Sequence, residues 1–154
     1  MSREFITLSP DDKVDRAIFL FHYEKIHHLP VVTDDGQLVG ILAQYDVRKV
    51  EAGPRRRVHE TQDGRRLTVS NRKVRTVMRR QPYTIGPEDS VEKAATLMAN
   101  EQIGSLPVID GNGALVGIIT STHLLGAFAR LFRFIPDSII AEERQAAEVL
   151  ETNC

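Results

Sequence analysis

Two stretches of this chain decide its fold, and they are close copies of one another. The first is Leu29-Pro30-Val31-Val32-Thr33-Asp34-Asp35-Gly36-Gln37-Leu38-Val39-Gly40-Ile41. The second, 77 residues later, is Leu106-Pro107-Val108-Ile109-Asp110-Gly111-Asn112-Gly113-Ala114-Leu115-Val116-Gly117-Ile118. At this offset residues 6–47 align with residues 83–124 without a gap and share 16 of 42 positions, where ordinary residue frequencies give about two or three. Such an internal repeat fixes the architecture before any local motif does.

Length and composition narrow the class of protein further. The 154 residues suffice for one domain, whereas a repeat of 42 residues is marginal for folding alone. We therefore expect one body with pseudo-twofold symmetry and a cleft along its axis. The single cysteine, Cys154, excludes an internal disulfide. The longest apolar run, residues 114–119, is far below the roughly 20 residues of a membrane helix, and no signal pattern opens the chain, so we expect a cytoplasmic protein.

Each copy predicts the order β-α-β-β-α, an α/β (α+β) fold. Short extended pieces at residues 5–8 and 83–85 precede helices, for which Ser9-Pro10 and Gly86-Pro87 indicate the N-cap and first position. Apolar residues then recur at helical spacing. Two strands follow in each copy, connected by two-residue turns at Asp35-Gly36 and Asn112-Gly113. Second helices begin near Gln44 and Ser121.

Charge is distributed unevenly and marks the domain organisation. Residues 48–80 carry a local charge of +9, whereas the tail from Pro136 carries −4. We divide the chain into a first repeat (1–50), an Arg-rich insert (51–75), a second repeat (76–135) and an acidic C-terminal helix (136–154). Residues 58–69 alternate weakly around an Asp-Gly turn and predict an exposed hairpin. Its flanks, residues 55–57 and 72–75, are alternatively disordered.

The repeated pattern resembles the paired CBS domain, a family named after cystathionine β-synthase. The first copy matches in Thr7-Leu8-Ser9-Pro10, in Ile26-His27-His28-Leu29-Pro30-Val31-Val32, and from Asp35 through Leu42 to Tyr45-Asp46. The second matches in Thr84-Ile85-Gly86-Pro87, residues 103–110 and residues 113–120. The resemblance implies two β-α-β-β-α units packed through their sheets, two clefts that bind adenine nucleotides or adenosyl compounds, homodimers, and a regulatory role without catalysis.

The resemblance also implies where the ligand binds. The family motif places a Ser or Thr after the return strand and an acid one turn on, for phosphate and ribose. The first copy keeps the acid, Asp46, but has Ala43 in place of the hydroxyl. The second keeps Thr120, beside Ser121 and Thr122, but has His123 in place of the acid. The adenine slot is implied at Thr7, Leu8, Pro30, Val31, Thr84, Ile85, Pro107 and Val108.

Each candidate also has a purely structural interpretation. Asp46, Thr120 and Ser121 fit helix caps, His123 a surface helix position, and Pro30 and Pro107 strand starts. His22, His27 and His28 do not have metal-ligand spacing, and no catalytic constellation stands out, so we expect neither a metal site nor an enzyme. The tyrosines, Tyr23, Tyr45 and Tyr83, are too scattered in sequence to predict a stacking surface.

Three functional hypotheses follow from the sequence. The first is a stand-alone sensor that binds AMP, ADP, ATP or S-adenosylmethionine, requires no cofactor, and regulates an unidentified partner protein. The second is a dimerisation module with degenerate clefts. The third is nucleic-acid binding through the basic residues 48–80, which could alternatively contact extra ligand phosphates or simply form a solvated connector.

Overall fold

The computed structural model describes residues 5–51, 57–60, 66–69 and 71–132. The chain forms two compact units, Met1–Ile119 and Thr120–Cys154. In the described part of the chain, no helix combines the length and the apolar character that crossing a membrane requires.

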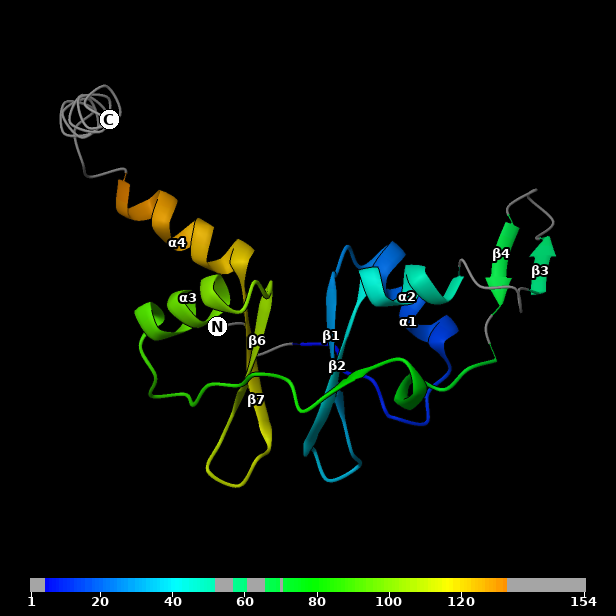
Figure 1. The fold of residues 1–154 in the computed structure, drawn as a ribbon, viewed down its shortest axis with the longest axis horizontal. Helices are drawn as coiled ribbons and strands as arrows, with labels where there is room; N and C mark the ends of the chain where they lie inside the picture. The colour runs from blue at the N-terminus through cyan, green and yellow to red at the C-terminus, as the bar shows by residue number, and fades with distance from the viewer. Residues whose placement is uncertain (1–4, 52–56, 61–65, 70, 133–154) are drawn as a thin grey trace, which may run out of the picture. The chain divides into compact units, whose positions relative to one another are not determined.

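The predicted element order is found in both repeats (Figure 1). The first repeat contains α1 (Val14–Tyr23), β1 (His28–Val32), β2 (Leu38–Ala43) and α2 (Gln44–Glu51). The second contains α3 (Val91–Asn100), β6 (Ser105–Ile109) and β7 (Leu115–Thr120), after which α4 (Ser121–Phe132) forms the described part of the second unit. The opening strand of each repeat is reduced to one parallel bridge, Leu8 to Val31 and Ile85 to Val108.

The hairpin loops differ from the predicted two-residue turns. Thr33 donates its N–H to the carbonyl of Gln37 at 2.9 Å, so three residues lie between the paired positions. Gly36 has a φ of +79° and the equivalent Gly113 has +83°, whereas Asp35 and Asn112 are not in the left-handed region. A three-residue loop that ends in one left-handed glycine fits this pattern. The prediction was wrong because Asp-Gly and Asn-Gly suit both loop types.

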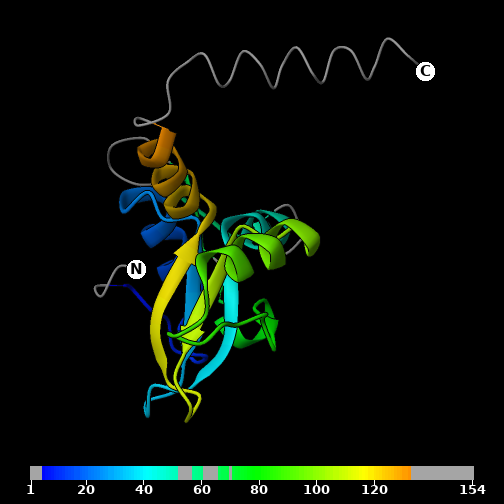
Figure 2. The ribbon, with the colours of Figure 1, turned by 90° about the vertical axis from the view of Figure 1, so that its left-hand side faces the viewer.

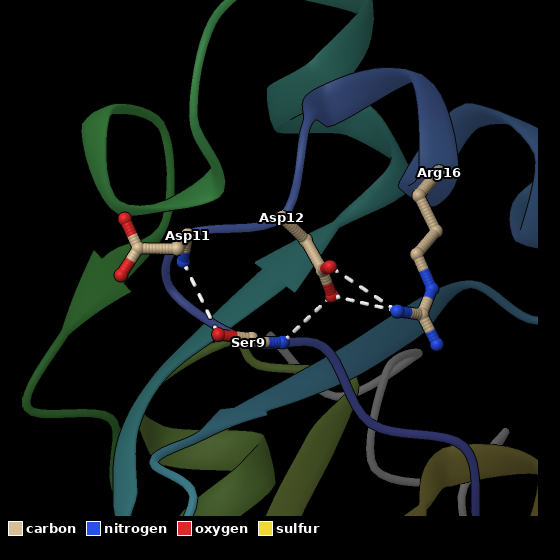
Figure 3. Close-up of polar contacts among 4 residues, drawn as sticks. All are labelled: Ser9, Asp11, Asp12 and Arg16. Atoms are coloured by element: carbon tan, nitrogen blue, oxygen red, sulfur yellow. Dashed lines mark hydrogen bonds and ion pairs between the residues drawn. The ribbon is translucent and has the colours of Figure 1, made fainter.

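The prolines before each helix also act differently from the prediction, because they lie in a turn and not in the helix. α1 begins at Val14 with Lys13 as N-cap. Ser9 donates its N–H to Asp12 Oδ2 at 2.8 Å, Asp12 N–H bonds the Ser9 carbonyl at 3.1 Å, and Arg16 pairs with Asp12 (Figure 3). The second copy closes the same turn between Gly86 and Asp89, and its helix is capped by Ser90. α1 itself has no side-chain cap, so Ser9 does not act as the N-cap that the sequence predicts.

The segment after the insert packs on the first repeat. Val74 is fully buried in the core cluster with Leu8, Val14, Leu29 and other first-repeat residues. Backbone bonds join Val74 N–H to the Asp12 carbonyl at 2.8 Å and Val14 N–H to the Arg72 carbonyl at 2.9 Å. Lys73 and Arg75 both pair with Asp11. The suggestion that residues 72–75 are disordered was therefore wrong, because an apolar anchor and an acidic turn hold them.

The insert forms the predicted hairpin, and a short strand follows it. β3 (Arg57–Glu60) pairs antiparallel with β4 (Arg66–Val69). The arginines at positions 55, 56 and 65, and the acidic tail from residue 133 on, lie outside the described residues. Beyond the 3₁₀ turn η1 (Val74–Thr76), β5 (Arg79–Arg80) adds to the edge of β2, so the sheet order is β1-β2-β5.

The two repeats meet through the backbone of their hairpin loops. Leu115 N–H donates to the Gly36 carbonyl at 3.1 Å, and Leu38 N–H donates to the Gly113 carbonyl at 3.3 Å. Figure 2 shows the two loops side by side at the lower end of the strands. These two bonds are equivalent under the repeat, which is the local symmetry that the duplicated sequence predicts.

Candidate functional site

The unit Met1–Ile119 contains a cleft of about 380 Å³ whose walls come from both repeats. This volume is in the range of small-molecule sites, roughly 300–1,000 Å³. The lining is part aromatic, part charged and part apolar, and consists of His28, Ile41, Ala43 and Tyr45 from the first repeat, residues 79–83 from the segment after the insert, and residues 101–105 from the second repeat.

One glycine brings the arginines of β5 to this cleft. β5 pairs with β2 so that Arg79 lies opposite Ile41 and Arg80 opposite Gly40. A Cβ on Gly40 would lie 2.7 Å from Met78 Sδ and 2.9 Å from the Arg79 carbonyl oxygen. These distances are shorter than van der Waals contact, so β5 can approach this closely only because position 40 has no side chain.

Left-handed backbone is concentrated at the same place. In the described residues three non-glycine positions have positive φ, namely Lys25, Gln81 and Gln102, with values of 51–52°. Gln81 and Gln102 both line the cleft, the first from the segment after the insert and the second from the second repeat. Gln102 and its equivalent Lys25 each follow a helix C-cap, where left-handed backbone is common, whereas Gln81 follows β5 and is locally constrained.

The main electrostatic feature is a forked ion pair at the rim. Arg79 Nε lies 3.2 Å from Asp46 Oδ2, and Arg79 Nη2 lies 3.3 Å from Asp46 Oδ1. The Asp46 side chain is 13% exposed and that of Arg79 is 58% exposed. The neighbouring Arg80 has no ion-pair partner in the described part of the chain. The rim therefore offers one neutralised and one uncompensated guanidinium.

His28 forms part of the wall and is held neutral by its surroundings. Burial lowers the pKa of His28 below its ordinary value of 6.5, and the charges of His27 and Arg79 lower it further, against a smaller opposing effect of Asp46. The ring packs against Gly104, where a Cβ would lie 3.0 Å from His28 Cε1. The small residue at position 104 therefore lets the imidazole contact the other repeat.

Two tyrosines contribute aromatic surface to the cleft. Tyr45 is 62% exposed and Tyr83 is 50% exposed, so both rings present area to a bound molecule. A hydrogen bond with the Glu101 carboxylate raises the pKa of the Tyr83 hydroxyl. The suggestion that the tyrosines were too scattered for a shared surface was wrong for this pair, because the fold brings residues 45 and 83 to one cleft.

Most residues of the predicted adenine slot belong to the core. Six of them are buried, namely Leu8, Pro30, Val31, Ile85, Pro107 and Val108. They join each opening segment to its strand through the parallel bridges. Thr7 and Thr84 are half-buried beside them. None of these eight residues lines the cleft described above, and contact between them and a ligand stays a prediction.

The second unit contains the four residues predicted to bind phosphate and ribose in the second copy, residues 120–123, and two of them form a helix cap. Thr120 Oγ1 accepts from the His123 N–H at 3.3 Å, and His123 Nδ1 accepts from the Thr120 N–H at 3.3 Å. This reciprocity is that of a capping box, with histidine in place of the usual Glu or Gln. Ser121 and Thr122 are exposed. Phosphate binding by these four residues stays a prediction.

The sequence reasoning missed the residues that line the cleft. His28 and Tyr45 lie in stretches that match the family, and Tyr83 directly precedes one, but none of the three was chosen as a candidate site residue. Arg79 and Arg80 were visible as part of the basic segment 48–80, but that segment was divided at residue 75 as an insert. The dipeptide at positions 79–80 was the available signal, because it directly follows Val77 and Met78, which pack against the core of the first repeat.

Two βαββα copies that share a cleft define a tandem-repeat α/β module. The family model of the CBS domain matches residues 1–53 and 74–130, and the chain belongs to this family. A CBS domain-containing protein of Dictyostelium discoideum is 33% identical over 136 residues, which are 88% of this chain and 92% of that protein. Inosine-5'-monophosphate dehydrogenase of Korarchaeum cryptofilum is 34% identical over 77% of this chain, but this match spans only 21% of the enzyme.

Solved structures with the same fold include two that contain adenosine compounds. The CBS domain pair of protein MJ0100, in complex with 5'-methylthioadenosine and S-adenosyl-L-methionine, is 26% identical with a TM-score of 0.68, over 84% of this chain and 91% of that one. CBSX2 in complex with AMP is 26% identical with a TM-score of 0.64, over 83% and 90%.

Proposed function

We propose that the protein is a regulatory sensor that binds an adenine nucleotide between its CBS repeats and modulates a partner protein in the cytoplasm. The ligand is AMP, ADP, ATP or S-adenosylmethionine, and the module itself performs no catalysis. The observation that carries this proposal is the cleft shared by both repeats, in which aromatic rings and arginines converge. Adenine can stack on a tyrosine ring, and phosphate suits the forked donors of arginine.

The arrangement also supports a way for the ligand to act. The cleft walls belong to different repeats, which are directly joined at the loops by two backbone bonds. A ligand that contacts both walls favours one relative position of the repeats over others. It shifts that equilibrium only as far as its affinities for the two states differ. A partner that recognises the favoured state would then read the nucleotide level.

Calorimetric titration with AMP, ADP, ATP and S-adenosylmethionine tests the proposal. We expect saturable binding of at least one compound at millimolar concentration or below, together with a rise in melting temperature. Asp46→Ala and Thr120→Ala should weaken different binding events, because they lie in different copies. No heat and no thermal shift with any of the four compounds would remove the proposal.

A second candidate function, dimerisation, is favoured by the exposed apolar side chains of α4. Leu125 is 67% exposed and Leu131 is 66% exposed, six residues apart on that helix. A homodimer that buries them would gain about 1.5–3 kcal/mol for each side chain covered completely. Size-exclusion chromatography with mass measurement, with and without nucleotide, separates a ligand-dependent sensor from a ligand-indifferent dimer.

A further inference from the structure

Arg79 pairs with Asp46, the carboxylate that would otherwise accept hydrogen bonds from the hydroxyl groups of a ribose. Asp46 faces it with both carboxylate oxygens, at 3.2 and 3.3 Å, and only 13% of the Asp46 side chain is exposed. Arg79 itself lines the cleft, whereas Asp46 is not among the lining residues. A ligand that brings hydroxyl groups to Asp46 must therefore move the guanidinium first.

The same guanidinium has donors to spare for another anion. The pair with Asp46 uses Nε–H and one N–H of Nη2, which leaves three of the five arginine donors, on Nη1 and Nη2, for a second partner. Both contacts are longer than the usual 2.7–2.9 Å or so of a charge-assisted bond, so the pair is loose. Arg80, next in the chain and also in the lining, has no ion-pair partner in the ranges described. A phosphate in the cleft would meet the free donors of Arg79.

Building on the proposed function, we infer that Arg79 is the specificity-determining residue of this cleft. It neutralises Asp46 until a ligand phosphate draws it away, which exposes the carboxylate to the ribose hydroxyls. The cleft therefore selects nucleoside phosphates over unphosphorylated adenosine. It also selects against adenosyl sulfonium compounds, because their positive charge would lie beside the Arg79 guanidinium.

The affinity lost by breaking the Arg79–Asp46 pair is smaller than the affinity gained by an arginine–phosphate contact. Breaking an exposed ion pair costs an adenosine ligand about 1.5- to 5-fold in affinity. A forked arginine–phosphate contact contributes about 10- to 100-fold. Substitution of Arg79 should therefore change the affinities for adenosine and for AMP in opposite directions. A residue that merely supported the fold would weaken both.

The experiment is calorimetric titration of adenosine and AMP into the wild type, Arg79→Gln and the double variant Arg79→Gln/Asp46→Asn. We expect AMP to bind the wild type at least tenfold more tightly than adenosine. In Arg79→Gln, AMP should weaken tenfold or more while adenosine strengthens up to about fivefold. The gain for adenosine should vanish in the double variant, because it depends on the released carboxylate.

Arg75→Gln is the matched control, since Arg75 pairs with Asp11 outside the cleft lining. It should leave the ratio of the two affinities unchanged. A measurement on the wild type alone covers the case in which Arg79→Gln does not fold: millimolar inorganic phosphate should strengthen adenosine binding, because it engages Arg79 in place of the ligand phosphate.

The outcomes separate the inference from the function on which it rests. If adenosine and all of AMP, ADP, ATP and S-adenosylmethionine fail to bind the wild type, the proposed function fails and the inference with it. If neither adenosine nor AMP binds but another of these compounds does, the inference is overturned while the sensor function stands. If adenosine and AMP bind the wild type equally, or Arg79→Gln weakens both by the same factor, the inference is overturned while the sensor function stands. A phosphate effect of zero on adenosine binding would also overturn it.

Discussion

Substitution of Gly40 by alanine tests how the cleft is held together. The added Cβ would lie 2.7 Å from Met78 Sδ and 2.9 Å from the Arg79 carbonyl oxygen. The thioether can rotate away, but the carbonyl belongs to β5 and can move only with the strand. Overpacking of this kind costs about 1–3 kcal/mol. For a chain of this size that lowers the melting temperature by about 2–12 °C.

The assay is urea denaturation followed by circular dichroism, with AMP titration of the same samples. The matched control is Gly111→Ala, because nothing lies within 4 Å of a Cβ there and its φ is not positive. We expect the control to stay within about 0.5 kcal/mol of the wild type or slightly above it. Gly40→Ala should lose both stability and AMP affinity, since β5 positions Arg79 and Arg80. Equal stability of the two variants would refute the close-approach argument.

Three further predictions concern other parts of the first unit. Val74→Ala should destabilise the protein by about 2–3 kcal/mol in urea denaturation, because it removes two buried methyl groups and leaves a cavity in the first repeat's core. A loss below about 0.5 kcal/mol would show that Val74 does not stabilise this core. Ser90→Ala should cost about 1 kcal/mol through loss of the cap bond to Lys93 N–H at 3.1 Å, and an unchanged midpoint would contradict that cap. The pKa of His28 lies below 6.5 in the folded state, so the unfolded chain binds more protons than the folded protein as the pH falls toward and below 6.5. The melting temperature of the wild type should therefore drop between pH 7.5 and pH 5.5. The drop should be smaller in His28→Gln, whereas the exposed control His22→Gln should show the same drop as the wild type.

The fold was predictable because its information is carried twice. Two copies of the same pattern identify the element order, and the glycines at 36 and 113 mark both loops. The error in the helix starts has a local cause. Asp12 and Asp89 bond to the chain three residues earlier, so Ser9-Pro10 and Gly86-Pro87 lie in a turn before the helix and not at its first positions. Both arrangements satisfy the same sequence pattern.

The candidate site was less predictable because its residues depend on distant packing. Asp46 was found from its place after the return strand, but its pairing with Arg79 spans 33 positions. That pairing depends on β5 joining the edge of β2, which no periodicity in a two-residue strand can indicate. Tyr45 and Tyr83 come together for the same reason. A sequence pattern indicates which face of a helix or strand a residue lies on, but it does not indicate which strands pair with one another.

The anchoring of Val74 has a consequence for how this chain can be altered. Glu51 ends a helix that packs against α1, and Arg72 bonds to the first residue of α1, so both ends of the intervening stretch attach to one lobe. A foreign domain inserted between residues 51 and 72 would therefore be attached to the first repeat at both of its ends. The loops that join the two repeats, at Gly36 and Gly113, lie elsewhere, which makes this position suited to a reporter domain.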